Sequence, residues 1–354
     1  MDFGFSQSQK DVSELARRVF TEDVDPARRW RRLAEAGLLG VGIPEEHGGA
    51  GGGLLELCAL LEEQGRATAE APIMPALLTA MTLAEHGMHP WLPALASGEV
   101  VLTAGFSQTE KCVLTTDRQV TPTESLTASH LDLSTGFPKV TGTLSMVAAA
   151  DRARRVLLVT DGGLVLVDPR APGATLAPQT ITTGETVWQL TLRSVECEPV
   201  ATGATAVEKL LARATVCLCA LELGVAERAL AMTAAYTTQR KQFERPIATF
   251  QAVSQRAADA YIDVEAMRLT MWRAAWLVAE GRDATAAIAI AKLWACEAGH
   301  RVVYAAQHLH GGIGFDVAYP LGRSYLWSKY LELTLGSAGS HLARLGAELA
   351  RSPR

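Results

Sequence analysis

The stretch QRKQFERPIATFQAV, residues 239–253, places two cations and an aromatic side chain shortly before a proline. Helical patterns precede and follow it, so it predicts a helix end, a loop and a new helix with Thr249 as its N-cap. Arg240 offers a planar guanidinium suited to a diphosphate, and Phe243 offers an apolar face that can lie against a ligand. Taken alone, the stretch is better explained as a surface loop with a solvated arginine.

A second stretch, QHLHGGIGFDVAYPLGR at residues 307–323, begins at Gln307 and follows a predicted helix. Gly311, Gly312 and Gly314 would let the backbone approach a ligand closely. No strand precedes these glycines and no βαβ unit surrounds them, so they are not the dinucleotide fingerprint of a parallel sheet. Alone, they are also explained as caps of a helix C-terminus.

The pattern of apolar residues changes twice along the chain. Apolar residues recur at helical spacing over residues 6–87, short β-branched runs occupy residues 100–200, and alanine-rich helical patterns follow from residue 206. The order predicts an α+β multidomain protein. Its expected parts are an N-terminal helical domain (1–98), a middle antiparallel β-domain (99–200) and a C-terminal four-helix bundle (201–354).

Length, charge and cysteine content exclude several classes of protein. A chain of 354 residues is longer than the roughly 250 to 300 over which one core stays undivided. The net charge of −5 comes with scattered cations, which disfavours nucleic acid as a partner. No apolar run reaches about 18 residues and no secretory pattern begins the chain, so we expect a cytoplasmic protein without membrane insertion. The six cysteines form no CxxC pair and predict reduced core residues, and no zinc-like spacing predicts a metal.

Together, the two stretches resemble the acyl-CoA dehydrogenase family. GLLGVGIPEEHGG at residues 37–49 is similar to its N-terminal signature, and VTGTLSMV at residues 140–147 is similar to its middle β-domain. The resemblance covers nearly the whole chain and implies assembly as dimers or tetramers. It also implies α,β-desaturation of an acyl-CoA thioester to a trans-2-enoyl-CoA. In that reaction FAD accepts hydride, a carboxylate removes the α-proton, and an electron-transferring flavoprotein is the electron acceptor.

The resemblance also assigns cofactor contacts by position. Arg240 and Phe243 match residues that touch the pyrophosphate end of FAD. Gln307 and Gly311 match residues near its adenine end. In the family these residues reach the cofactor of the neighbouring subunit, so the resemblance implies a site shared between chains.

The catalytic glutamate of the family has no counterpart at either of its two usual positions, and no catalytic residue is assigned. Leu335 occupies one position and Ala214 the other. Glu332 and Glu222 are the candidate carboxylates to take its place. Their ordinary explanations are a solvated helix-end carboxylate for Glu332 and an ion pair with Arg228 for Glu222.

Two further positions depart from the family pattern. Thr109 and Glu110 are followed by KCVLTT where the family has Thr-Glu-Pro and then Gly-Ser-Asp against the flavin ring, and Glu244 replaces a glycine. Residues donated to a neighbour therefore persist, while residues used within the chain are lost. This pattern suggests one half of a hetero-oligomer whose homologous subunit carries the base, as in actinobacterial steroid side-chain breakdown. The alternatives are a non-catalytic structural subunit, and a flavin oxidase or desaturase of carrier-bound thioesters.

Overall fold

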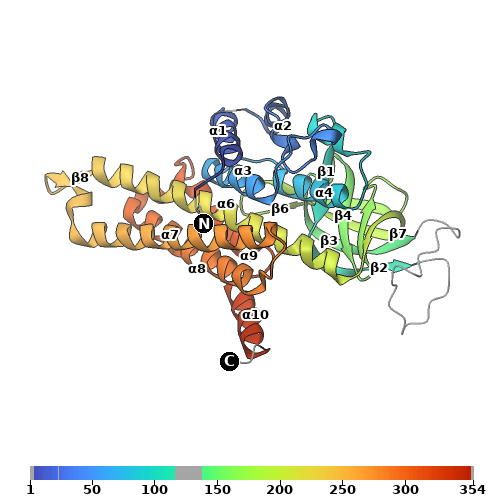
Figure 1. Ribbon diagram of the computed structural model, residues 1–354. Coiled ribbons are helices and arrows are strands. Elements are labelled where there is room, and N and C mark those ends of the chain that lie inside the picture. The colour runs from blue at the N-terminus through green and yellow to red at the C-terminus, as the bar shows by residue number, and fades with distance from the viewer. Residues whose placement is uncertain (1–3, 23, 116–137, 352–354) are drawn as a thin grey trace. The chain divides into compact units, whose positions relative to one another are not determined.

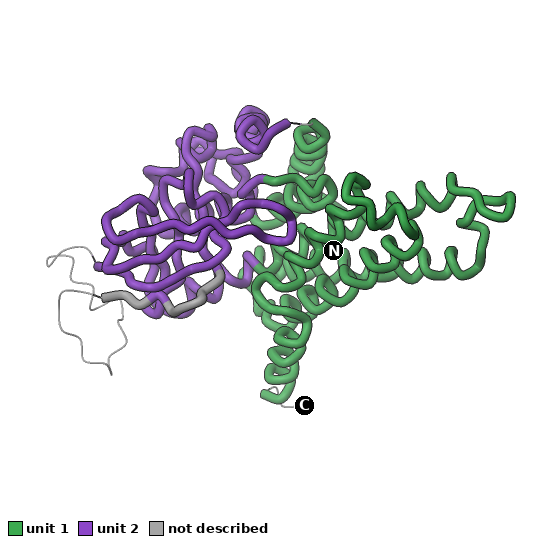
Figure 2. Tube along the Cα trace, turned by 180° about the vertical axis from the view of Figure 1, so that it is seen from behind, with its two compact units in different colours: residues 1–23, 54–70, 215–354 green, residues 24–53, 71–214 purple. Residues whose placement is uncertain are grey.

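The computed structural model of the protein describes residues 4–22, 24–115 and 138–351, which fall into two compact units (Figure 2). One unit contains the long helices of the C-terminal half together with two N-terminal helices. The other contains the sheet with the remaining N-terminal helices. The units comprise residues 1–23, 54–70 and 215–354, and residues 24–53 and 71–214. The three-domain division at residues 98 and 200 stays a prediction.

The sheet unit is built from short helices and seven strands. Its helices are α2 (Pro26–Glu35), η1 (Leu38–Gly40), η2 (Glu45–His47), α4 (Ile73–Glu85) and α5 (Leu92–Ala96). Its strands are β1 (Val101–Gly105), β2 (Ser107–Thr115), β3 (Lys139–Ala148), β4 (Ala153–Thr160), β5 (Gly163–Val167), β6 (Ala174–Thr180) and β7 (Thr186–Thr202). Helix α4 packs on β1, where the hydroxyl of Thr79 donates to the carbonyl of Thr103 at 3.1 Å.

The strands pair in the order β1-β4-β5-β7-β3-β2, with β6 also on β7. The long strand β7 serves both halves of the sheet, because residues 187–196 pair with β3 and residues 197–202 pair with β5. Inward-facing Val, Leu, Ala and Cys side chains from five of the strands and one turn form one buried cluster. Side chains along β3 alternate between buried positions and positions that are partly or fully exposed, as expected of a strand with one face on the core.

One pairing differs from the antiparallel expectation. Strands β1 and β4 are parallel, with Leu102 opposite Arg155, whereas the other pairs among the described strands are antiparallel. Parallel neighbours need a long crossover connection, and here β2 and β3 lie between them in sequence. The sequence pattern of a five-residue strand does not reveal such a distant partner.

The helical unit consists of long helices joined by tight turns. Its elements are α1 (Gln7–Thr21), α3 (Leu54–Ala67), most of α6 (Ala204–Gln239), β8 (Lys241–Gln242), β9 (Arg245–Pro246), η5 (Ile247–Thr249), α7 (Gln251–Ala279), α8 (Thr285–His310), η6 (Gly311–Phe315), α9 (Leu321–Leu333) and α10 (Ala338–Arg351). Helices α6, α7 and α8 lie side by side, and the β8–β9 hairpin joins the far ends of α6 and α7 (Figure 1). None of the described helices is long and apolar enough to cross a membrane.

Two glycines let α3 and α6 touch through their backbones. A Cβ at Gly224 would lie 1.9 Å from the carbonyl oxygen of Glu62, and one at Gly65 would lie 2.0 Å from that of Leu221. No side chain fits at either position, so glycine is required for this helix crossing. All six cysteines are buried free thiols, which confirms their prediction as reduced core residues.

An ion-pair network reinforces the same helices. Arg66 on α3 pairs with Glu62 at 2.9 Å and with Glu227 on α6, and Glu227 also pairs with Arg268 on α7. Burial, together with the nearby charge of Glu227, raises the pKa of Glu62 to about 7. The network joins three helices at a depth where unpaired charges would be costly.

Candidate functional site

The hairpin at the end of α6 holds the first predicted motif. Lys241 pairs with Pro246 and Gln242 with Arg245, which leaves Phe243 and Glu244 at the tip. Both tip residues have positive φ, 52° and 64°, as a type I′ turn requires. Glycine and asparagine tolerate that conformation best, so a phenylalanine and a glutamate there carry backbone strain. The glycine that the family has in place of Glu244 would relieve part of it.

The hairpin offers cationic and aromatic groups to its surroundings. Phe243 is 86% exposed, and among the described residues the guanidinium of Arg240 makes no hydrogen bond or ion pair. Arg245 stacks over Phe250 at 4.2 Å, and Phe243 meets the same ring edge-on at 6.1 Å. An exposed aromatic side chain held in a strained turn is poorly explained by the stability of the monomer.

The expected N-cap at Thr249 is wrong. Helix α7 begins at Gln251 with Phe250 in the cap position, and no side chain caps it. The hydroxyl of Thr249 instead donates to the carbonyl of Pro246 at 2.7 Å. Threonine hydroxyls satisfy a local turn as readily as a helix start, so the sequence signal was ambiguous.

The glycine turn that ends α8 holds the second predicted motif. Gly311 follows the helix with φ 63° and ψ −141°, and a Cβ at Gly311 or at Gly312 would meet nothing within 4 Å. Gly314 behaves differently, because a Cβ there would lie 2.5 Å from Oε1 of Gln307. That amide oxygen is buried without a hydrogen-bond partner among the described residues. The turn therefore combines open space beside Gly311 with an unsatisfied polar group under Gly314.

A stack of rings brings the two motifs together. Tyr236, one turn before Arg240 on α6, stacks on His310 at 4.5 Å between ring centroids. The ring of Tyr319 also contacts His310, tilted to it by 56° with 5.4 Å between ring centroids. All four predicted cofactor-contact residues therefore belong to segments joined at one end of the bundle. No local sequence pattern links Tyr236 to His310, because the two residues are 74 positions apart.

Both positions expected for a base carry apolar side chains, one buried in a helix and one in a hydrogen-bonded turn. Ala214 lies buried on α6 and presents only a methyl group. Leu335 has a positive φ of 57° in the turn between α9 and α10. Side chains from neighbouring helices fix this turn: Nε2 of His341 lies 3.0 Å from the carbonyl of Leu335, and Nζ of Lys292 donates to the carbonyl of Leu331 at 2.6 Å. Neither Ala214 nor Leu335 can accept a proton.

Glu222 is a core residue, and its expected ion pair with Arg228 is wrong. Arg228 donates instead to the backbone carbonyl of Arg66 at 3.2 Å. The Glu222 side chain is buried, accepts a hydrogen bond from Ser328 at 2.7 Å and lies against Gly299. Burial raises the pKa of Glu222 to about 8. A carboxyl held protonated in the core is unsuited to act as the base for a bound substrate.

Glu332 is engaged on the surface of α9 and α8. Its carboxylate pairs with Lys329 at 2.5 Å and lies 3.6 Å from the imidazole of His300. It is therefore a paired carboxylate and not a solvated one. Thr109 and Glu110, which directly precede the expected departure in the β-domain, lie in β2, and their side chains fall outside the described part of the structure.

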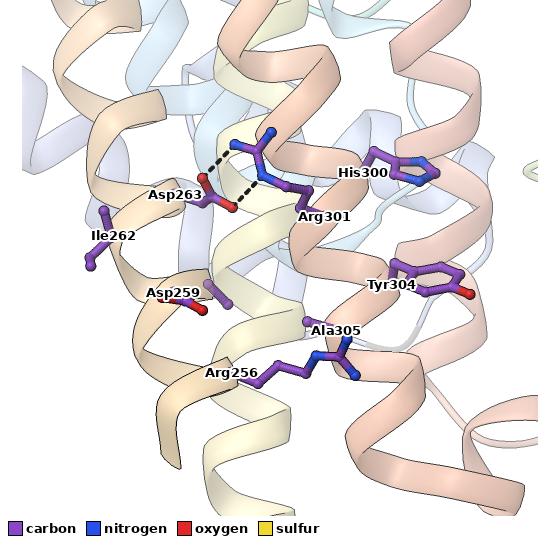
Figure 3. A pocket seen from close by; sticks show the side chains of 9 residues that line it. Arg256, Asp259, Ile262, Asp263, His300, Arg301, Tyr304 and Ala305 are labelled. Carbon is purple, nitrogen blue, oxygen red and sulfur yellow. Dashed lines mark hydrogen bonds and ion pairs between the residues drawn. The ribbon is translucent and has the colours of Figure 1, made fainter. Parts of the chain in front are cut away.

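A hollow of 530 Å³ on the face of α7 and α8 was not predicted (Figure 3). Asp263 and Arg301 form a bidentate ion pair across it, at 2.6 and 2.9 Å. Ile262 and Tyr304 beside this pair are 63% and 57% exposed. Large exposed apolar residues next to a hollow are typical of a surface that contacts another protein.

Comparison with known proteins shows which family the chain is similar to. Residues 7–99 match the model of the acyl-CoA dehydrogenase N-terminal domain, and residues 201–350 match that of the C-terminal domain. Acyl-CoA dehydrogenase FadE27 of Mycobacterium tuberculosis is 35% identical over 98% of this chain and 93% of its own length.

Two solved structures are similar throughout their length. A chain of the ChsE4-ChsE5 complex from Mycobacterium tuberculosis has a TM-score of 0.88 and 32% identity, covering 100% of both chains. A chain of the Tcur3481-Tcur3483 steroid acyl-CoA dehydrogenase has a TM-score of 0.87 and 38% identity, covering 98% of this chain and 99% of the other. By these matches, this chain belongs to the acyl-CoA dehydrogenase family, whose members are oxidoreductases.

Proposed function

We propose that the chain is the base-lacking subunit of a hetero-oligomeric, FAD-dependent acyl-CoA dehydrogenase that desaturates an acyl-CoA thioester to the trans-2-enoyl-CoA. The observation that carries the proposal is a contrast. The Arg240 hairpin and the Gly311 turn are joined at one open end of the bundle, whereas Leu335 and Ala214 leave the chain without a base.

The open end of the bundle fits the diphosphate and adenine of FAD. The hairpin carries the cations Arg240, Lys241 and Arg245 against the single anion Glu244, so it can neutralise a diphosphate. Among the described residues, no atom lies within 4 Å of a Cβ built at Gly311, which leaves room for a planar ligand against the backbone. When bound, FAD supplies the hydride acceptor for the β-carbon of the thioester.

The roles of the chain's own residues follow from these features. Arg240 donates paired N–H groups to phosphate oxygens, and Phe243 covers the same end of the cofactor from water. The side chain of Gln307 hydrogen-bonds near the adenine, and Gly311 permits close approach of the backbone. The homologous subunit provides the carboxylate that removes the α-proton and most of the contacts to the flavin ring.

The substrate class and partners are inferred from the relatives. A chain of a steroid acyl-CoA dehydrogenase is 38% identical to this chain, and a chain of a two-component complex is 32% identical. We infer an acyl-CoA that carries a steroid ring, a homologous subunit in a dimer of dimers, and an electron-transferring flavoprotein as acceptor. The 530 Å³ hollow on α7 and α8 is a plausible place for a contact between subunits.

The test is coexpression with a homologous chain encoded in the same genomic neighbourhood. We expect a mixed oligomer with FAD, active on a steroid acyl-CoA with ferrocenium as electron acceptor, and no activity from this chain alone. Arg240→Ala in the complex should lower FAD affinity, whereas Arg273→Ala, an exposed arginine on α7, should not. A yellow, fully active homo-oligomer would refute the proposal.

A second candidate is a structural subunit that stabilises the partner without touching FAD. The absence of an ionisable group at Leu335 and Ala214 favours it equally. FAD affinity separates the two functions, because a purely structural subunit predicts no effect of Arg240→Ala on FAD affinity.

A further inference from the structure

The ring stack at the end of α8 contains a buried histidine with an unusual hydrogen-bond state. His310 is 3% exposed, although it lies beside the exposed turn at Gly311. Its Nδ1 lies 2.8 Å from the carbonyl of Ala306, which requires a proton on Nδ1. Its Nε2 is buried without a partner among the described residues. In the neutral ring this nitrogen therefore carries only a lone pair.

The groups around His310 do not favour a charged imidazole. Among the described residues, the titratable groups in ring contact with it are Tyr236 from α6 and Tyr319 from the segment after η6, and neither is a carboxylate. Burial lowers the pKa of His310, partly offset by the carbonyl of Ala306. A proton added to Nε2 would be a buried N–H without an acceptor, which is costly.

The stack is connected directly to the Arg240 hairpin. The carbonyl of Tyr236 accepts the backbone N–H of Arg240 at 2.8 Å, and the carbonyl of Arg240 accepts that of Ile247 at 2.8 Å. A displacement of the Tyr236 ring would therefore act on the turn of α6 from which the hairpin starts. On the other side of the stack, His310 is the residue before Gly311.

We propose that His310 is a positioning residue: as a neutral ring held by Tyr236 and Tyr319, it fixes the Arg240 hairpin against the Gly311 turn, and its protonation releases the two. Only one consequence of this inference rests on the proposed function, namely that the released state binds FAD less tightly. The positioning itself is a property of this chain.

The direction of the pH effect follows from the lowered pKa. A histidine whose pKa is depressed in the folded state stabilises that state above its unfolded value, about 6.5, and loses the contribution as the pH falls. We therefore expect loosening of the hairpin on acidification from pH 7.5 to 5.5.

Three variants test the inference in the coexpressed complex. His310→Phe keeps an aromatic ring but cannot be protonated, and His310→Ala removes the ring. His308→Phe is the matched control, because His308 is an exposed histidine on the same turn. Backbone hydrogen exchange at Arg240 and Ile247, corrected for intrinsic rates, reports on the hairpin, and equilibrium dialysis reports on FAD.

In the wild type and in His308→Phe, we expect exchange to rise and FAD affinity to fall about three- to ten-fold at pH 5.5, the size of an aromatic pair. His310→Phe should abolish the pH dependence, and His310→Ala should give fast exchange at both pH values. Equal pH responses in wild type and His310→Phe, or unchanged exchange in His310→Ala, would overturn the inference. If exchange behaves as expected but no variant binds FAD, the proposed function fails while the positioning role stands.

Discussion

The packed middle of the bundle and its hairpin end use the same residue types in opposite ways. In the middle, Gly65 and Gly224 are filled by the backbone of a neighbouring helix, and Glu222 is buried. At the end, a side chain at Gly311 would meet open space, and Phe243 is exposed. The open space beside Gly311 is available to a group from outside the chain.

The difference separates what the chain uses for its own stability from what it offers to another molecule. In the middle, burial raises the pKa of Glu222 to about 8, so this carboxyl is largely protonated at neutral pH and is not an ionised base. The end supplies cations, an aromatic face and open backbone. This distribution of groups is expected of a subunit whose loops contact the cofactor of a neighbouring subunit and whose neighbour supplies the catalytic base.

The largest effect is expected from a methyl group in the middle. Gly224→Ala should lower the free energy of unfolding by about 3 kcal/mol or more, because the Cβ would lie 1.9 Å from a backbone oxygen of α3. Gly346→Ala on α10, where a Cβ meets nothing within 4 Å, should instead stabilise by about 0.5–1 kcal/mol. Chemical denaturation of both variants measures the two changes in the free energy of unfolding. Equal changes would show that Gly224 is not required for the crossing of α3 and α6.

The second-largest effect is expected at the hairpin end of the bundle, on FAD affinity. Arg240→Ala should weaken FAD binding by about 10- to 100-fold, the value of one charge-assisted contact, with little change in thermal stability. Titration of the apo-complex with FAD measures it. Arg273→Ala serves as the control, and a similar loss there would mean that the effect is general electrostatics.

Glu222 gives a pH-dependent test of the middle. Its folded pKa of about 8 exceeds the ordinary 4.5, so wild-type stability should decline as pH rises between these values. Glu222→Gln mimics the protonated form. Relative to wild type it should gain on the order of 1 kcal/mol per pH unit over that interval. Turnover of the complex should be unchanged, and a loss of several orders of magnitude would instead identify Glu222 as the base.

The smallest effect is expected at the hairpin tip. Glu244→Gly should stabilise the chain by about 1 kcal/mol, because glycine adopts the positive φ of 64° without strain. It should also raise FAD affinity slightly by removing an anion from the cationic hairpin. Thermal melts and FAD titration check both, and a destabilised variant would show that Glu244 makes a contact worth more than the strain.

Much of the fold was predictable because its signals are local. The β-branched run of β3 and the helical spacing of α7 and α8 can each be recognised within about ten residues of sequence. The Arg240 and Gly311 motifs were predicted for the same reason, since each is a contiguous run.

The rest depends on contacts between distant parts of the chain. The parallel pairing of β1 with β4 and the stacking of Tyr236 on His310 require knowledge of packing. Glu222 was misassigned to Arg228 because charged residues are usually on the surface, and nothing in the adjacent sequence reveals a buried Ser328.

The most direct test of the central claim is native mass spectrometry of the coexpressed chains, combined with FAD quantification and a desaturation assay. The account predicts a mixed oligomer that holds FAD and turns over, while this chain alone is inactive. Full activity and full flavin content in an oligomer of this chain alone would contradict it.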